Sequence, residues 1–541
     1  MLKRALSLIL ALILCLGILA GCQQTPAETS TPADTAAPAG TTAPAETTVP
    51  QETEPEKLYF EEPLVIDMVR PVVPAAPDVS YIVDLLKETL NVEIKLNELD
   101  NLDEQYSLML NDNRLPSVTW INSSNYGNQY GAEGAYINIM DYLDQMPNFK
   151  AALEANPRYI DFWQNPDGSM YHIPCIYING ESTTRAFFYR EDILAKHNLT
   201  WPTTREGLEE LLRELKKLYP DSYPMCVRYL GGTHITNVVD WGVAFGAKLT
   251  FSGRDKAYTN YNNETGKWYE GATAPEMKEM ISWLKDMMEE GLIHPSGPTM
   301  TTGEWQAYLS TSESFIGWDR MDHIAAINTE GVKTNAEFSL VGATPIQMAE
   351  AGHAAYLAPS VVTYSYLISS NAERLDDILA FIDWLYSEEG IMITNYGKKD
   401  ETYTLDAEGN PVWTDACKAE EHPQLGRGMT SGGFYGIFDF NSYVGWQSDA
   451  MQRTYETITP YATVPNYYPS MVGKYNETEQ ATIDAYGAAY QTFVKGELVK
   501  FLLGERDLSE WDAFVQEATT TYHGADLVAV SQSAWDRANA G

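Results

Sequence analysis

The run Ser314-Phe-Ile-Gly-Trp-Asp-Arg320 places an indole, a carboxylate and a guanidinium next to one another after a short apolar segment. Sugars present hydroxyls for hydrogen bonds and apolar C–H faces for stacking, so their sites combine Trp or Tyr with Asp, Asn, Glu and Arg. The pattern predicts a strand that ends at Gly317 and then presents Trp318, Asp319 and Arg320 to a ligand. The alternative is that Asp319 caps a helix beside a packed tryptophan.

Two more segments combine aromatic side chains with polar groups or flexible glycines. A Gly-rich turn at 231–237 contains His234 and precedes Asp240 and Trp241, although a single histidine is more often a hydrogen-bonded structural residue than a ligand. Gly432-Gly-Phe-Tyr-Gly436 places Tyr435 between glycines, a composition that suits a loop beside a ligand, and Trp446 follows it. We therefore add these five side chains to the candidate binding residues.

The sequence contains none of the motifs HExxH, Gly-x-Ser-x-Gly, Gly-x-x-x-x-Gly-Lys or the dinucleotide-binding glycine pattern. We therefore expect no enzymatic activity and no cofactor. A glycosidase pair of carboxylates stays open as an alternative, because it is defined by a separation of about 5–10 Å that a sequence does not display. Cys175, Cys226 and Cys417 match no zinc or CxxC spacing, and we expect buried free thiols.

The elements that must position these residues begin with alternating strand and helix patterns. Apolar β-rich runs at 63–69, 92–96 and 117–121 alternate with helical patterns at 79–90 and 102–111. This order predicts an α/β lobe with a mainly parallel sheet, whose ligands bind beyond the carboxyl ends of the strands. Trp120 and Asn122 are candidates for that reason.

The middle of the chain is predicted to be helical with interruptions. Amphipathic patterns at 192–197, 274–290 and 372–388 predict helices there. A further helix follows Pro202, and we expect Thr203 to cap it, with Glu206 three residues later completing a capping box.

The amino terminus has the form of an export signal. Lys3 and Arg4 precede an apolar run that is shorter than the ~20 residues of a membrane-spanning helix. Leu19-Ala-Gly-Cys22 resembles a bacterial lipobox, which implies that residues 1–21 are removed and that Cys22 is lipidated. Residues 22–57 are rich in Thr, Pro, Ala and Glu, and we expect a disordered tether.

The whole sequence is acidic, with 36 Lys and Arg against 75 Asp and Glu and a formal net charge of −39. Such a field repels nucleic acid and anionic lipid surfaces. We therefore expect no nucleic-acid partner, contact with a membrane through the lipid anchor alone, and a neutral ligand.

Several phrases together resemble the lipoprotein extracellular solute-binding proteins of carbohydrate ABC importers, the broad family that includes maltose-binding and alginate-oligosaccharide-binding proteins. The phrases are Asn113-Arg-Leu-Pro-Ser-Val118, Asp167-Gly-Ser-Met-Tyr-His-Ile-Pro174, Phe188-Tyr-Arg-Glu-Asp-Ile-Leu194, Leu199-Thr-Trp-Pro-Thr-Thr204, Tyr261-Asn-Asn-Glu-Thr-Gly-Lys267 and Asp383-Trp-Leu-Tyr-Ser-Glu-Glu-Gly390. Each phrase alone is weak, but their order and spacing extend over most of the chain.

The resemblance implies an α/β, two-lobe periplasmic-binding-protein-like fold of type II, with hinge-linked mixed sheets flanked by helices. It implies a first lobe of 58–184 with 342–399, a second lobe of 185–341 with 400–541, and a sugar held between them as the hinge closes. Tyr177, Tyr364 and Tyr366 then become hinge or cleft candidates, and Trp318 resembles a sugar-stacking tryptophan of the maltose-binding type.

The resemblance also implies partners and a location. These are an oligosaccharide, the permease subunits of an ABC importer, and the outer face of the cell membrane of a Gram-positive bacterium, with the protein itself a monomer. Relatives of the alginate-binding type carry a calcium loop where this sequence reads Lys216-Lys-Leu-Tyr-Pro-Asp-Ser-Tyr-Pro224. One carboxylate is too few for such a site, so we expect no metal. A surface glycoside hydrolase and a binder of peptides or another solute remain the alternatives.

Overall fold

The structure is a computed structural model, and it describes residues 57–72, 78–100, 102–112, 114–121, 124–165, 167–180, 184–228, 240–247, 259–262, 265–358, 361, 363–420, 423–429, 434–464, 471 and 475–539. The predicted signal, the lipidation site Cys22 and most of the predicted tether lie outside these residues. Contacts divide the chain into Met1–Lys57 and Leu58–Gly541, and all the elements below belong to the second unit.

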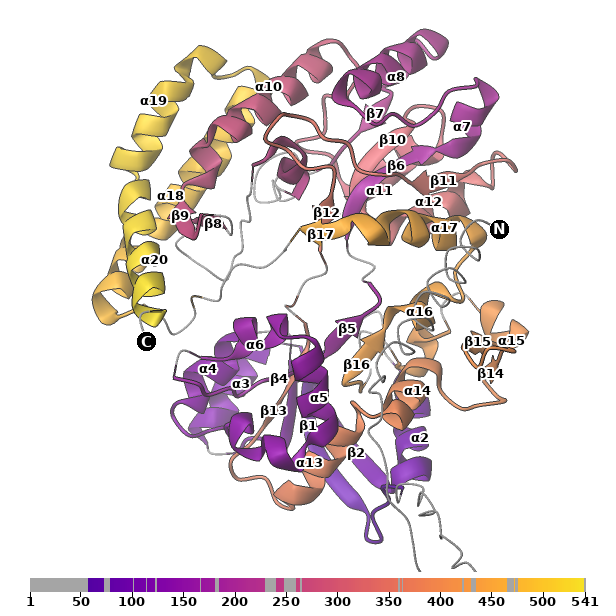
Figure 1. Cartoon of the computed structure of the whole chain (residues 1–541), viewed down its shortest axis with the longest axis vertical. Coiled ribbons are helices and arrows are strands. Elements are labelled where there is room, and N and C mark those ends of the chain that lie inside the picture. Colours follow the sequence, from indigo (N-terminus) through magenta and orange to yellow (C-terminus); the bar gives the residue numbers. More distant parts are fainter. Residues whose placement is uncertain are drawn as a thin grey trace, which may run out of the picture. The chain divides into compact units, whose positions relative to one another are not determined.

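The predicted strand–helix–strand–helix–strand opening is confirmed. The strands β1 (Leu64–Pro71), β2 (Val92–Leu99) and β3 (Val118–Ile121) are parallel, and α2 (Ser80–Leu90) and α3 (Leu102–Asn111) connect them. They belong to a five-stranded sheet with the order β2-β1-β3-β13-β4 (Figure 1). The strands β13 (Ser365–Ile368) and β4 (Ile173–Pro174) continue it in antiparallel pairing, so the sheet is mixed, and β13 alone runs opposite to its other four strands.

A second sheet has four strands in the order β11-β6-β10-β7. The strand β6 (Arg185–Arg190) pairs antiparallel with β11 (Leu340–Gly342) and with β10 (Ile316–Arg320), which in turn runs parallel to β7 (Met225–Cys226). Because β10 extends through Arg320, the prediction that this strand ends at Gly317 is wrong. Asp319 is a residue within the strand and therefore caps no helix.

Helices and short turns surround the two sheets. The elements between β3 and β10 are α4 (Ser124–Gly131), η1 (Ile139–Gln145), α5 (Pro147–Ala155), α6 (Arg158–Trp163), β5 (Ile176–Ile178), α7 (Glu191–Lys196), α8 (Arg205–Leu218), η3 (Gly242–Phe245), β8 (Asn260–Asn262), β9 (Lys267–Tyr269), η4 (Gly271–Thr273), α10 (Pro275–Glu289) and α11 (Thr302–Ser310). The helices predicted at 192–197 and 274–290 are thus confirmed as α7 and α10 within two residues.

The remaining elements follow β10 in the chain. They are α12 (His323–Gly331), β12 (Tyr356–Leu357), α13 (Leu375–Trp384), α14 (Glu388–Tyr396), β14 (Tyr403–Leu405), β15 (Pro411–Trp413), α15 (Asp415–Lys418), η5 (Leu425–Arg427), β16 (Ile437–Asp439), α16 (Phe440–Val444), α17 (Asp449–Ile458), η6 (Thr459–Tyr461), β17 (Ala462–Val464), α18 (Glu477–Leu503), η7 (Leu508–Glu510), α19 (Trp511–Gln516), η8 (Glu517–Thr521) and α20 (Gly524–Ala538). Among the described helices, none is both long and apolar enough to cross a membrane.

The helix predicted at 372–388 is in fact two helices, α13 and α14. The first ends at Trp384, and Ser387 caps the second, because its hydroxyl accepts a hydrogen bond from the Gly390 amide at 3.1 Å. A Cβ at Gly390 would lie 2.0 Å from the Trp384 carbonyl oxygen, so glycine permits this close approach of the two helix ends.

The chain passes between the two sheets at several points. The first passage leaves β5, where Asn179 (φ 63°) and Gly180 (φ 128°) are two consecutive left-handed residues. A Cβ on Gly180 would lie 2.7 Å from the Phe440 ring, and the Asn179 amide donates to the Asp439 carboxylate at 2.8 Å. Since β16 also pairs with β5, the segment around Asp439 is joined to this passage by both backbone and side chains.

The return passage runs from β11 to β13 and contains β12, which pairs with β17. The limits of the two lobes stay a prediction. Two contacts favour moving the segment 403–439 from the second predicted lobe to the first: the Asn395 amide donates to the Ile437 carbonyl at 2.8 Å, and the Arg427 guanidinium lies over the Tyr81 ring of α2.

The carboxyl-terminal helices α18 and α20 contact each other, and α18 also contacts α10 (Figure 1). Asn476 and Glu479 form a capping box at the start of α18, and the Arg537 guanidinium of α20 donates to the Glu479 carboxylate at 2.6 and 2.8 Å. The hydrogen bond from Arg537 lowers the pKa of Glu479 to about 2, against the opposing effect of burial. This ion pair joins the first turn of the long helix to the end of the chain.

The helix α8 is capped by Thr204 and not by Thr203. The Thr204 hydroxyl accepts a hydrogen bond from the Gly207 amide at 3.1 Å, and glycine at that position has no side chain to complete a capping box. We predict that Thr204→Ala lowers the free energy of unfolding by about 1 kcal/mol, because one amide of the first turn loses its acceptor. Urea unfolding measures this change, and Thr203→Ala, which is the matched control, should leave stability within about 0.5 kcal/mol. The reverse order would restore Thr203 as the cap.

The ion pair of Glu479 predicts a pH dependence of stability. A carboxyl whose folded pKa is about 2, against an ordinary value of 4.5, stabilises the fold above the higher value, and the contribution is lost as the pH falls through the lower one. Glu479→Gln keeps the reach of the side chain but removes its charge. We expect the variant to be less stable than the wild type near pH 7 and the difference to shrink between about pH 4.5 and 2. Urea unfolding at a series of pH values tests this, and a difference independent of pH would contradict it.

Candidate functional site

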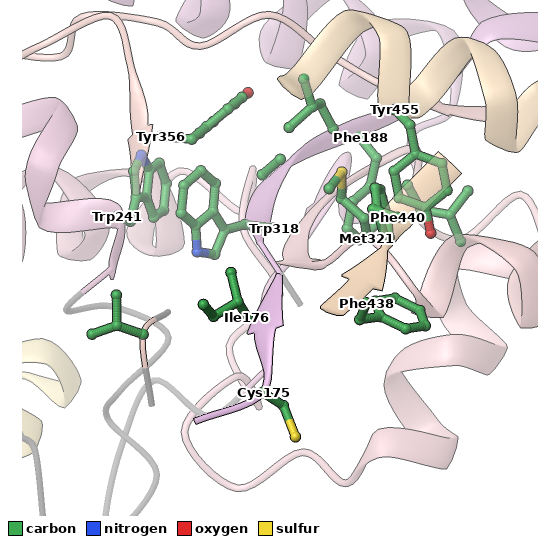
Figure 2. Close-up of a cluster of buried hydrophobic side chains, with 14 of the residues drawn as sticks. Cys175, Ile176, Phe188, Trp241, Trp318, Met321, Tyr356, Phe438, Phe440 and Tyr455 are labelled. Carbon is green, nitrogen blue, oxygen red and sulfur yellow. The ribbon is translucent and has the colours of Figure 1, made fainter. Parts of the chain in front are cut away.

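Trp318 lies in a cluster of aromatic rings on the four-stranded sheet. In the register of β10 and β6, Trp318 is opposite Phe187, and the two rings meet edge to face with centroids 4.9 Å apart. Trp241 stacks beside Trp318 at 5.8 Å, and Tyr356 covers it at the same centroid distance (Figure 2). Trp318 is 2% exposed and Trp241 is 0% exposed, so in this conformation both indole rings are covered by other parts of the protein.

The neighbour of Trp318, Asp319, is a fully buried carboxylate. The Arg228 guanidinium donates to it at 2.6 Å, and Arg185 approaches it at 3.8 Å. A second carboxylate, Asp240, accepts from Arg185 at 2.5 Å. Burial raises the pKa of Asp240, and the attraction of Arg185 opposes this effect. A buried carboxylate is costly unless it is paired, so these arginines are required for the fold to hold Asp319.

Arg228 also contacts the first residues of the helices α11 and α12. It donates to the Thr302 hydroxyl at 2.7 Å and lies 2.9 Å from the Nε2 atom of His323. Burial lowers the pKa of His323, so the imidazole is neutral near neutral pH. Its Nε2 atom can therefore accept a hydrogen bond from the Arg228 guanidinium.

Arg320, the third predicted residue of the run, has a more exposed position. Its guanidinium pairs with Asp322, with the Nε atom 3.1 Å from the carboxylate. Burial, and then the nearby Asp322 carboxylate, raise the pKa of Tyr443 to about 12. Trp446 packs edge to face on Tyr443. Trp446 is half-buried, which leaves part of its ring accessible.

A separate group of predicted residues gathers at the five-stranded sheet. Trp120 stacks on Tyr364 with centroids 3.8 Å apart and planes 5° from parallel. The hydroxyls of Tyr177 and Tyr435 are 3.2 Å apart, and the Tyr366 hydroxyl donates to the Tyr435 carbonyl at 3.0 Å. These contacts bring five predicted residues together from β3, β5, β13 and the segment before β16.

The candidate residues therefore form two groups. The first group lies at the five-stranded sheet and consists of Trp120, Tyr177, Tyr364, Tyr366 and Tyr435. The second group lies at the four-stranded sheet and consists of Asp240, Trp241, Trp318, Asp319 and Arg320, with Trp446 near Arg320. Asn122 and His234 lie outside the described residues. The sequence predictions missed Arg185, Arg228, Phe187 and Tyr356, which hold the second group in place. Their signal in the sequence is weak, because an arginine in or near a strand looks like any solvated charge until its buried partner is known.

The three cysteines of the body, Cys175, Cys226 and Cys417, are buried and free, as predicted. Burial raises the pKa of the Cys226 thiol to about 12. The Cys226 thiol is therefore protonated at neutral pH, and all three buried cysteines serve as small packing residues.

Comparison with known proteins identifies the family. The model of the bacterial extracellular solute-binding proteins matches residues 79–392, which is more than half of the chain. The chain belongs to this family. The resemblance predicted from the sequence is confirmed, and the matched residues include both sheets apart from β1.

Individual relatives of this solute-binding protein are distant. The fructooligosaccharide ABC transporter substrate-binding protein FusA of Streptococcus pneumoniae is 21% identical over 506 residues, covering 86% of this chain and 88% of FusA. Lipoprotein LipO of Bacillus subtilis is 21% identical over 347 residues, covering 61% and 66%. A solute-binding protein of Bifidobacterium longum infantis, described as binding human milk oligosaccharides ("HMO"), has a TM-score of 0.66 at 18% identity and covers 88% and 99%. The predicted periplasmic-binding-protein-like fold is therefore confirmed.

In this solute-binding protein the segment 216–224, for which the sequence predicts no calcium loop, is organised around Lys216. The Lys216 ammonium donates to the Ser222 carbonyl at 2.6 Å and lies over the Tyr223 ring. Within the part of the chain that the structure describes, no three His, Cys, Asp or Glu side chains are grouped as metal ligands. The absence of a metal site stays a prediction.

The buried pair of Asp319 and Arg228 gives a test of the second group. We predict that Asp319→Asn lowers the free energy of unfolding by about 3 kcal/mol, because it leaves the buried Arg228 guanidinium without its charge partner. Asp322→Asn is the matched control, since the Arg320 side chain is 40% exposed and its pair with Asp322 should contribute less than about 1 kcal/mol. Urea unfolding of both variants measures the two losses. Equal losses would contradict the structural role of Asp319.

Proposed function

We propose that this solute-binding protein captures an oligosaccharide outside the cell and delivers it to the permease of an ABC importer. The observation that carries the proposal is the match to the solute-binding family over 79–392, together with similarity to FusA over 86% of the chain. FusA is described as binding fructooligosaccharides, and the Bifidobacterium protein as binding human milk oligosaccharides. The common class is an oligosaccharide, which we take as the ligand here.

The chemistry of the two candidate groups supports a neutral ligand. The arginines of the second group are each close to a carboxylate: Arg185 to Asp240, Arg228 to Asp319 and Arg320 to Asp322. Since these charges balance one another, the group offers no excess positive charge to attract an anion. Rings and hydroxyls of the first group suit the C–H faces and hydroxyls of a sugar.

The proposed mechanism is binding with closure of two lobes and involves no bond making. Contacts from both lobes to one ligand stabilise the closed form over the open form, because the open form makes only part of them. We propose the two sheets as the cores of these lobes and the residues of both groups as the ligand contacts. The protein acts as a monomer.

We also propose that Cys22 carries a lipid and holds the protein on the outer face of the membrane of a Gram-positive bacterium. The sequence Leu19-Ala-Gly-Cys22 supports this, as does the description of the relative LipO as a lipoprotein. The residues between Cys22 and Leu58 would then separate the binding body from the membrane.

A thermal-shift screen tests the proposed function. We expect a neutral oligosaccharide to raise the unfolding temperature, because a ligand at 100 times its dissociation constant adds about 2.7 kcal/mol of stability. The screen compares kestose, maltotriose and lacto-N-tetraose with a pool of peptides, and chromatography of the incubated sugars detects hydrolysis. Stabilisation by peptides alone, or the release of shorter sugars, would replace the proposal with one of the two alternatives.

A further inference from the structure

Tyr364 lies at the edge of the five-stranded sheet where the parallel strands end. In the antiparallel pair of β13 and β3, Ser365 is opposite Ile121, the last residue of β3. Tyr364 therefore continues one residue past the carboxyl end of β3. Open α/β sheets bind their ligands at this edge, so Tyr364 has the position expected of a ligand contact.

The stack of Tyr364 on Trp120 determines which ring can meet a ligand. The two rings are nearly parallel, so each covers one face of the other. Trp120 is 1% exposed, whereas Tyr364 is half-buried. The accessible part of this aromatic pair therefore belongs to Tyr364, and Trp120 supports it from behind.

Backbone hydrogen bonds fix the segment that carries Tyr364. The Cys175 amide donates to the Tyr364 carbonyl at 2.7 Å, and the Thr363 hydroxyl donates to the Cys175 carbonyl at 2.6 Å. Two residues earlier, the Val361 carbonyl accepts from the Trp163 indole at 3.0 Å. Because the ring is already held in place, little conformational entropy is lost when a ligand stacks on it.

Two phenol groups lie beside this platform. Tyr177 is half-buried and its hydroxyl is 3.2 Å from that of the buried Tyr435. Burial raises the pKa of Tyr435, and the nearby Tyr177 and Tyr364 act in the same direction. Tyr435 therefore stays protonated, and either of the two hydroxyls can be the donor of this hydrogen bond.

We propose that Tyr364, backed by Trp120, is the stacking platform for one ring of a neutral oligosaccharide. This inference rests on the proposed function and assigns the part of the site that the five-stranded sheet supplies. It places the accessible aromatic surface on Tyr364, whereas the indoles of Trp241 and Trp318 are covered by other rings.

Calorimetry of the full chain with whichever of kestose, maltotriose and lacto-N-tetraose stabilises the wild type most tests the platform. We expect Tyr364→Ala to weaken binding by at least about tenfold, as for other buried aromatic contacts, and Tyr364→Phe to stay within about threefold. Tyr59→Ala is the matched control, because Tyr59 is 58% exposed and precedes β1 at the opposite edge of the sheet.

Two further measurements separate the possible failures. Tyr364→Leu keeps an apolar side chain of similar bulk without an aromatic face, so a loss of binding at an unchanged unfolding temperature identifies stacking as the cause. If a sugar binds the wild type and Tyr364→Ala binds it within about threefold, the platform is refuted while the proposed function stands. If none of the three sugars binds the wild type, the proposed function is refuted and the platform with it.

Discussion

The buried carboxylate of Asp319 is the constraint on which the second sheet depends. It lies within β10 with no exposed surface, so it needs charged partners that are close and fixed. Arg228 and Arg185 meet this need from two different parts of the chain. Through them, the end of β7, the start of β6 and the residue Asp240 are held around one point, and the aromatic rings beside that point take fixed positions.

The aromatic residues of the protein have two different surroundings. On the four-stranded sheet, Trp318 and Trp241 are packed against Phe187 and Tyr356, and their role in this conformation is the packing of a core. On the five-stranded sheet, the stacked Tyr364 keeps part of its ring accessible. Burial therefore distinguishes aromatic residues that look equivalent in the sequence. It favours the phenol ring of Tyr364 over the indole rings of Trp241 and Trp318 as the candidate for ligand contact.

Regular periodicity was sufficient to predict the first sheet, because each of its parallel strands and connecting helices is a continuous pattern in the chain. Periodicity alone did not predict that β13 and β4 join this sheet, since their partners are more than 50 residues away and their runs are only four and two residues long. The family resemblance did place residues 342–399, which include β13, in the same lobe as the first strands. The capping of α8 by Thr204 was missed for a similar reason: two adjacent threonines are equivalent until the backbone of each is known. For the site, residue types identified the aromatic candidates, but the arginines that hold them depend on contacts between distant segments.

The passage that leaves β5 has a consequence for the kinds of residue the chain can accept. Gly180 combines a left-handed backbone with a close approach to the Phe440 ring, and the two restrictions act independently. Asparagine, which tolerates left-handed backbone at position 179, would still collide with the ring at 180. If position 180 were randomised and folded variants were selected, glycine would be recovered, because any other side chain meets both restrictions. The passage between the two sheets therefore depends on one residue that has no side chain.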